Sequence, residues 1–262
     1  MSAVTKGVPR LALKDVLSQG RTAFATFNVF GGSRVAQVLA HTGVDAVIVD
    51  REHGHVDDSQ MHDMVPTVAS SGVSPIVRIA GFKGSEIKRA LDTGAHGIIA
   101  PMVSTAEDAR LVVRQSKFPP VGTRGQGSPF ACFSYGFATP AEYVAHANEQ
   151  ILVMAQIETS EAVDNVYEIC QVDGLDLLLI GPNDLSLAIL GYAPPKGNEE
   201  IYYSSIDKVV ATAKKYGKYV GMVVVDGASA KAASENFDLV VLTADGRALQ
   251  AWYRKEVAIA RS

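Results

Sequence analysis

Cysteine, net charge and long apolar runs are all scarce in this chain of 262 residues. Its two cysteines, Cys132 and Cys170, are too few for a disulfide framework, which predicts free thiols and a reducing, cytoplasmic compartment. The formal net charge of −4 offers no basic surface for a nucleic-acid backbone. No run approaches the ~18 apolar residues of a membrane span, and residues 1–10 lack the apolar core of a secretory signal. We therefore expect neither nucleic acid nor membrane as a partner.

Short apolar, β-branched runs recur along the chain with amphipathic segments between them, which is typical of parallel strands connected by helices. The runs lie at 23–28, 45–50, 75–79, 97–101, 151–158, 175–181, 219–225 and 238–242. Helices are expected at 33–42, 60–70, 85–93, 106–115, 160–170 and 199–216. Because eight such repeats in about 250 residues are characteristic of one architecture, the sequence predicts a single-domain (β/α)8 TIM barrel.

A doubly wound parallel sheet is the alternative fold. The turn after the first strand disfavours it, because residues 29–33 lack the GxGxxG spacing of a dinucleotide-binding loop. The segment 117–139 is rich in proline and glycine and is expected to be a long loop, serving as a lid or binding segment. Residues from about 245 onward are expected to form a C-terminal helical tail.

Polar residues follow several predicted strands, and the carboxyl ends of barrel strands are where catalytic groups gather. Glu158 and Asp184 end consecutive strands, so a barrel places both carboxylates side by side on one rim. Carboxylate oxygens suit Mg²⁺ or Mn²⁺ better than Zn²⁺. Alternatively, the two acids cap the helices that follow them. Spacing alone leaves both interpretations open.

Arg78 and His53 are the other candidates from the same rim. An unpaired guanidinium inside an apolar run is costly, so Arg78 requires an anionic partner, either a substrate carboxylate or Glu52. His53 follows Asp50 by three residues, a spacing that lets a carboxylate hold one ring nitrogen while the other acts as a general base; a solvated histidine is the alternative. Residues 181–184 offer backbone N–H groups at a helix start, a natural seat for a carboxylate.

Taken in order, these segments resemble the HpcH/HpaI class II (metal-dependent) pyruvate aldolases, from about residue 24 to residue 192. The matching motifs include Asp50-Arg51-Glu52-His53-Gly54, Pro75-Ile76-Val77-Arg78, Gln156-Ile157-Glu158-Thr159 and Gly181-Pro182-Asn183-Asp184. Each motif alone is weak, but their shared order is specific. The match is poor at 223–247, and Phe27 stands where many relatives carry tryptophan.

The resemblance implies a lyase that reversibly cleaves a 4-hydroxy-2-oxo acid to pyruvate and an aldehyde through a metal-stabilised enolate. Glu158 and Asp184 would bind the divalent ion, which would be Mg²⁺, Mn²⁺ or Co²⁺. Arg78 would contact the keto oxygen of the substrate, and His53 with Asp50 behind it would be the base. The remaining substrate contacts implied are Gln156, Pro182 and Asn183.

Two other functions remain compatible with the same residues. One is an oxaloacetate decarboxylase or a related carbon–carbon bond-forming synthase, and the other is a non-catalytic barrel that binds a carboxylate. The resemblance also implies a homo-oligomer, a trimer or hexamer in which the C-terminal helix and Trp252 contact a neighbouring subunit.

Overall fold

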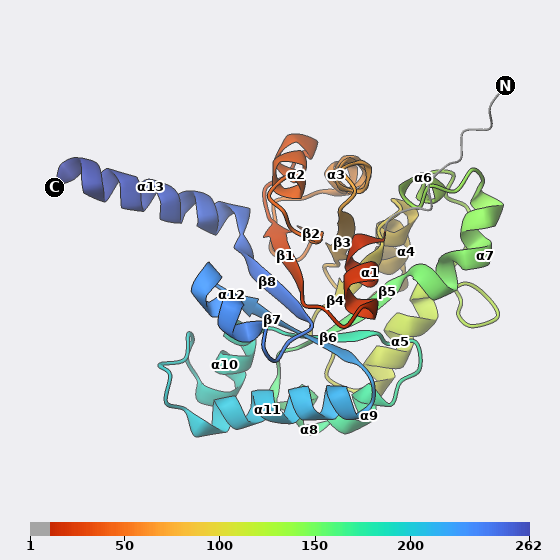
Figure 1. Cartoon of the computed structure of the whole chain (residues 1–262). Coiled ribbons are helices and arrows are strands. Elements are labelled where there is room, and N and C mark those ends of the chain that lie inside the picture. Colours follow the sequence, from red (N-terminus) through yellow and green to blue (C-terminus); the bar gives the residue numbers. More distant parts are fainter. Residues whose placement is uncertain (1–10) are drawn as a thin grey trace.

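Eight parallel strands pair in chain order and close into a barrel in which β1 lies beside β8 (Figure 1). The computed structural model describes residues 11–262, so the stretch 1–10 examined above for a signal sequence lies outside the described residues. The strands are β1 (Ala23–Asn28), β2 (Ala46–Asp50), β3 (Ser74–Arg78), β4 (Gly97–Ala100), β5 (Leu152–Ile157), β6 (Leu177–Ile180), β7 (Tyr219–Val224) and β8 (Leu239–Ala244). The predicted (β/α)8 barrel is confirmed.

Helices surround the barrel and join its strands. They are α1 (Ala12–Ser18), α2 (Ser33–Ala40), α3 (Asp58–Ser70), α4 (Gly84–Asp92), α5 (Ala106–Ser116), α6 (Ala131–Ser134), α7 (Pro140–Gln150), α8 (Ser160–Asp164), α9 (Val166–Cys170), α10 (Pro182–Leu190), α11 (Glu200–Lys215), α12 (Gly227–Ala233) and α13 (Asp245–Arg261). The helix expected at 160–170 is divided into α8 and α9 at Asn165. Among the described helices, none is long and apolar enough to cross a lipid bilayer.

The segment 117–139 is less open than its composition suggests. It contains the short helix α6 and is tied to α4 by Arg124, whose guanidinium donates to Asp92 at 3.0 Å and to the Tyr143 hydroxyl at 2.8 Å. The Arg124 guanidinium also lies 4.5 Å above the Phe118 ring. These contacts hold the segment against the outer helices, and it lines no part of the cavity at the carboxyl end of the barrel.

The alternation of side chains along the strands divides the core into two layers. Ile48, Ile76 and Met154 belong to the cluster inside the barrel, whereas Val47 and Val49 belong to the layer between strands and helices. Leu13, Val16 and Leu17 of α1 join the interior cluster and close the amino-terminal end of the barrel. The open end of the barrel is therefore its carboxyl end.

His96 is buried where the chain enters β4. Its Nε2 lies 2.9 Å from the carbonyl oxygen of Ser134 and its Nδ1 lies 3.1 Å from the Ser74 hydroxyl. Burial lowers the pKa of His96 from 6.5 to about 4, so the ring stays neutral in the folded protein.

We predict that His96 makes the protein less stable in mild acid. As the pH falls below about 6.5, the unfolded chain binds a proton at this residue that the folded chain does not bind until about pH 4. The free energy of unfolding should therefore fall by about 3 kcal/mol across this window. Urea unfolding of wild type and His96→Gln at matched pH values measures the effect. Equal pH slopes for the two proteins would contradict it.

Candidate active site

A cavity of about 690 Å³, a size typical of small-molecule sites, opens at the carboxyl end of the barrel. One side of it is polar, and the sequence-predicted residues Asp50, His53, Arg78, Gln156, Pro182, Asn183 and Asp184 lie there. The opposite side is mostly apolar, with Phe27, Val29, Phe30, Val223, Val224, Val225, Ala244 and Leu249. Arg247 is the charged residue on that second side.

The strand register explains why the polar residues meet. Ile48, Ile76 and Met154 point into the barrel, and the inward position two residues further along each strand lies at its mouth. Those next positions are Asp50, Arg78 and Gln156, all of them at most 8% exposed. Glu158 follows Gln156 by two residues and is 2% exposed.

Arg78 is held by a carboxylate on the neighbouring strand. Asp50 and Arg78 are register partners on β2 and β3, and the guanidinium binds the carboxylate through two hydrogen bonds, with Nε 2.9 Å from Oδ1 and Nη2 bonded to Oδ2. Glu52 Oε2 lies 3.3 Å from Nε, and the Phe27 ring lies 4.4 Å below the guanidinium carbon. Of the partners considered from the sequence, Glu52 is in contact, but the closer partner is Asp50.

The same Asp50 carboxylate shapes the loop that carries His53. Its Oδ1 accepts the backbone N–H of Glu52 at 3.1 Å and that of His53 at 3.2 Å. The His53 side chain is 63% exposed, and the carboxylate in contact with its ring is that of Glu52, at 3.7 Å from Nε2. Asp50 thus acts on His53 through the backbone in this structure.

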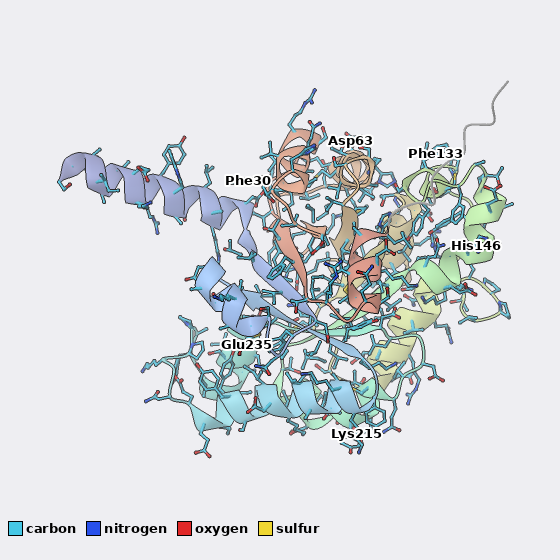
Figure 2. All side chains as sticks on the ribbon, viewed as in Figure 1. Phe30, Asp63, Phe133, His146, Lys215 and Glu235 are labelled. Carbon is cyan, nitrogen blue, oxygen red and sulfur yellow. The ribbon has the colours of Figure 1, made fainter. Side chains whose placement is uncertain are left out.

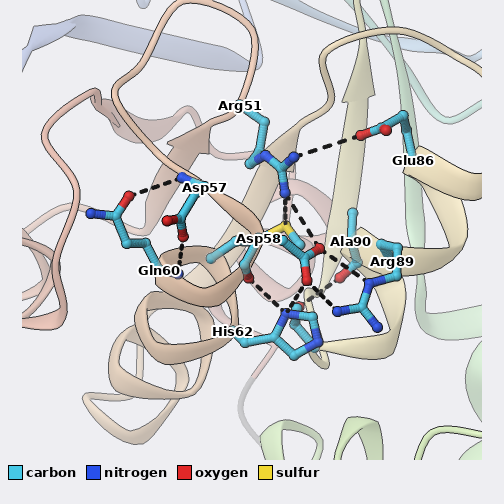
Figure 3. A network of polar contacts seen from close by, with 10 residues as sticks. Arg51, Asp57, Asp58, Gln60, His62, Glu86, Arg89 and Ala90 are labelled. Carbon is cyan, nitrogen blue, oxygen red and sulfur yellow. Dashed lines mark hydrogen bonds and ion pairs between the residues drawn. The ribbon is translucent and has the colours of Figure 1, made fainter.

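Arg51 anchors the outer side of this loop to α3 and α4 (Figure 3). Its Nη1 lies 3.5 Å from Asp58 and its Nη2 lies 3.8 Å from Glu86, while Asp58 also pairs with Arg89. The loop is therefore fixed from the cavity side by Asp50 and from the helix side by Arg51.

Of the two acids expected to bind metal, Glu158 is the buried one and Asp184 is exposed. Its Oε1 accepts the backbone N–H of Met102 at 2.7 Å, and its Oε2 accepts the Gln156 amide. Burial raises the pKa of the Glu158 carboxyl, and the negative charges of Glu52 and Asp184 act in the same direction. Met102 has φ of +55°, a strained conformation for this residue that aims its N–H at the carboxylate.

Asp184 lies in the first turn of α10, and this helix begins directly after Gly181. A Cβ built on Gly181 would lie 2.5 Å from Glu158 Oε2 and 2.8 Å from Gln156 Nε2. The absent side chain therefore lets the start of α10 approach the buried Glu158 carboxylate, and Asp184 in the first turn of this helix lines the cavity.

These two acids fit a hard divalent cation. Within residues 11–262 no group of three or more histidine, cysteine, aspartate or glutamate side chains is arranged to hold a metal, so a site at Glu158 and Asp184 would offer two protein ligands. Mg²⁺ and Mn²⁺ are commonly bound by one or two carboxylates, with water and substrate completing the shell. A cation here would also offset the burial and, secondarily, the repulsion from Glu52 and Asp184 that raise the Glu158 pKa.

Asp245 is a positioning residue that spacing did not reveal. Its carboxylate accepts the Asn28 amide at 2.7 Å and the backbone N–H groups of Val29 at 2.9 Å and Phe30 at 3.2 Å. It thereby ties the first turn of α13, which carries Arg247, to the end of β1; Figure 2 shows Phe30 beside the start of α13. The poor family match at 223–247 is only an indirect signal of this residue.

We predict that Gly181→Ala disrupts the acid pair. Because the new methyl group would overlap Glu158 Oε2 and Gln156 Nε2, affinity for Mn²⁺ should fall by roughly 10- to 100-fold, as for lost support of a metal ligand. Isothermal titration calorimetry with Mn²⁺ measures the affinity. Gly227→Ala is the matched control, because a Cβ there meets nothing within 4 Å. Equal affinities for the two variants would contradict the proposed crowding.

Comparisons with known proteins identify the family of the chain. The sequence profile of the HpcH/HpaI aldolase/citrate lyase family matches residues 31–248. A hydroxypyruvate/pyruvate aldolase of Rhizorhabdus wittichii is 37% identical over 247 residues, covering 94% of this chain and 96% of that protein. A 4-hydroxy-2-oxo-heptane-1,7-dioate aldolase of Salmonella dublin is 34% identical over 220 residues, covering 84% of this chain and 82% of that protein. The crystal structure of an HpcH/HpaI aldolase from Desulfitobacterium hafniense superposes with a TM-score of 0.87 at 32% identity, covering 95% of this chain and 96% of that chain.

The closed barrel and the aldolase relatives over most of the chain together identify an enzyme that makes or breaks carbon–carbon bonds, a carbon–carbon lyase. The chain belongs to the HpcH/HpaI aldolase/citrate lyase family. The resemblance seen in the sequence and the expectation of a lyase are thereby confirmed. Aldolases of this family work with a divalent metal ion.

Proposed function

We propose that this protein reversibly cleaves a 4-hydroxy-2-oxo acid to pyruvate and an aldehyde. The observation that carries the proposal is the Arg78 guanidinium, buried at the cavity floor and locked by Asp50. Two of its five N–H groups bond Asp50, and the Nη1 edge faces Gln156 at 3.5 Å, which is beyond a strong hydrogen bond. A fixed cation with unused donors suits the oxygen on which negative charge develops when the carbon–carbon bond breaks.

Glu158 and Asp184 would hold the divalent ion, Mg²⁺, Mn²⁺ or Co²⁺. The ion would act as a Lewis acid that spreads the negative charge of the pyruvate enolate. Gln156 would fix the Glu158 oxygen that faces Gly181, and the backbone after Pro182 would seat the substrate carboxylate at the start of α10. Asn183 lines the same part of the cavity.

His53 would remove the proton of the substrate hydroxyl. Its ring lies on the polar side of the cavity, is reachable from solvent and belongs to the residue type whose unperturbed pKa suits proton transfer near neutral pH. Asp50 contributes by ordering the His53 backbone and by orienting Arg78.

We predict that Glu158→Gln and Asp184→Asn each remove metal-dependent cleavage. Loss of a direct ligand should exceed the roughly 10- to 100-fold cost of losing an outer partner. The measurement is pyruvate release from a 4-hydroxy-2-oxo acid, with and without EDTA and with Mg²⁺ or Mn²⁺ restored. Asp164→Asn, an exposed acid of α8 outside the cavity, is the control and should behave as wild type. Turnover retained by either ligand variant, or by metal-free enzyme, would overturn the assignment.

The same assay separates the alternative functions. Pyruvate release from oxaloacetate alone would favour a decarboxylase or a related synthase over an aldolase. Metal-dependent binding of pyruvate without turnover of either substrate would favour a non-catalytic carboxylate-binding barrel. We predict a cytoplasmic compartment from composition; both cysteines are free, as expected, and the structure shows that both are buried.

We also propose that the protein is a homo-oligomer, a trimer or hexamer, assembled through α13. Figure 1 shows this 17-residue helix extending away from the barrel, and only Asp245 within it is buried. Its exposed apolar residues are Leu249, Trp252, Tyr253, Val257 and Ile259. Because isolated helices of this length are marginal in water, a second copy of the chain is needed to cover these side chains.

We predict that Trp252→Ala with Tyr253→Ala shifts the protein towards monomers, because two aromatic side chains more than half exposed in the single chain would lose their contact area in the assembly. Sedimentation velocity of both proteins measures the distribution of species. Phe133→Ala, which removes a 67% exposed aromatic of α6 (Figure 2), is the matched control. A monomeric wild-type protein, or an unchanged distribution in the double variant, would refute the role of α13.

A further inference from the structure

Phe27, near the carboxyl end of β1, packs its ring against the Arg78 guanidinium. The guanidinium carbon lies 4.4 Å from the centre of the ring, well within the ~6 Å range of a cation–π contact. Phe27 is 6% exposed and Arg78 is 8% exposed, and both residues line the cavity. Because a cation–π contact is strongest where water is kept away, this pair has the burial that makes such a contact matter.

A backbone irregularity lies at the same level of the barrel. The register of β1 with β8 pairs Ala25 with Val241, and continued regularly it would pair Phe27 with Thr243. Instead Phe27 pairs with Ala244, and Thr243 has φ of +34°. An extra residue of this kind bends a strand, re-aims side chains and occurs often beside active sites. Local backbone geometry, as well as side-chain alternation, therefore sets where the Phe27 ring lies.

The hydrogen bonds of Arg78 leave one motion of the guanidinium unrestrained. Asp50 binds it along a single edge, through Nε and Nη2, and a planar group held at one edge can still hinge about that edge. A competing acceptor is close by, because Glu52 Oε2 lies 3.3 Å from Nε and, among the described residues, is buried without a hydrogen bond. A guanidinium free to tilt could share its donors with Glu52 instead of presenting the Nη1 edge near Gln156.

We propose that Phe27 is a positioning residue that fixes the plane of the Arg78 guanidinium. Asp50 fixes one edge of the group and the ring lies against its face, so the two together define the direction of the N–H groups that Asp50 does not use. The catalytic consequence rests on the proposed function, in which these N–H groups meet the substrate oxygen. The contact between ring and guanidinium does not depend on that function.

The consequence for the reaction is electrostatic. A donor stabilises negative charge on the developing enolate oxygen best when it is already aimed at that oxygen, because reorientation during the reaction costs free energy. Loss of the Phe27 ring should therefore slow the chemical step more than it weakens substrate binding. If the ring only filled space in the barrel, an apolar side chain of similar size such as leucine would serve nearly as well.

The first test follows the Arg78 Nε–H by proton–nitrogen NMR, with its signal assigned by triple-resonance experiments and by its loss in Arg78→Lys. In Phe27→Leu the signal should lose the displacement caused by the neighbouring aromatic ring, and its proton should exchange faster with water. Phe27→Trp keeps an aromatic face and should retain both properties. Phe24→Leu is the matched control, because Phe24 lies on the same strand but does not line the cavity. An unchanged signal in Phe27→Leu would overturn the proposed contact.

The second test measures pyruvate release from a 4-hydroxy-2-oxo acid with Mn²⁺ present. In Phe27→Leu kcat should fall roughly 10- to 30-fold with little change in KM, which corresponds to the loss of one desolvated cation–π contact. Phe27→Trp should recover most of kcat. Mn²⁺ affinity, measured by calorimetry, should equal that of wild type in both variants, because Phe27 is not a proposed ligand. Equal losses of kcat in the leucine and tryptophan variants would show that the ring only fills space and would overturn the proposal.

Oxalate binding gives a readout that does not require turnover. Oxalate is a planar dianion that resembles the pyruvate enolate, so with Mn²⁺ present its affinity should fall roughly 10-fold in Phe27→Leu and should hold in Phe27→Trp and Phe24→Leu. This pattern in a wild-type protein that does not cleave the substrate would refute the proposed function alone. Normal oxalate affinity and normal kcat in Phe27→Leu would refute the role of Phe27 alone.

Discussion

The burial of one guanidinium organises the carboxyl end of this barrel. An arginine cannot release its proton, so Arg78 at the cavity floor requires anions nearby, and β2 supplies one directly opposite it. The Asp50 carboxylate meets that demand and with its remaining capacity binds the backbone of the loop that carries Glu52 and His53. The carboxylate that fixes the Arg78 guanidinium therefore also fixes the loop. Arg78 and His53, to which we assign different parts of the chemistry, are both positioned by Asp50.

The surroundings of Glu158 form a second constraint on the site, and one part of this constraint is the lack of a side chain at Gly181. Gly181 allows α10 to start against Glu158, and Met102 is held in an unfavourable conformation to direct its N–H at the same carboxylate. Strain of this kind persists only where the surroundings enforce it. Glu158 is therefore held rigidly by its surroundings, which suits its proposed role for an ion that binds through few protein ligands.

Much of this arrangement could be predicted from the sequence, because it follows from periodicity. Eight apolar runs specify the barrel, and the period of two along each strand carries the inward face from Ile48 to Asp50 and from Ile76 to Arg78. What could not be predicted depends on partners from distant parts of the chain. Spacing placed Asp50 behind the His53 ring, whereas the strand register directs it to Arg78. The helix α1 that closes the barrel, and the contacts of Asp245 with β1, likewise depend on tertiary packing that no local pattern encodes.

The seam between β8 and β1 has an evolutionary consequence. Thr243 has φ of +34° two residues before Asp245, which fastens α13 to β1, and the register between β1 and β8 shifts between Ala25 and Phe27. The apolar side of the cavity therefore combines the ends of these strands with the first turns of α13. Substitutions at Arg247 or Leu249 alter that wall without touching the strands that carry Arg78 and Glu158. The residues proposed to break the bond and those of the opposite wall thus lie on separate pieces of the chain, so one helical turn can change the shape of the cavity while the proposed bond-breaking residues stay the same.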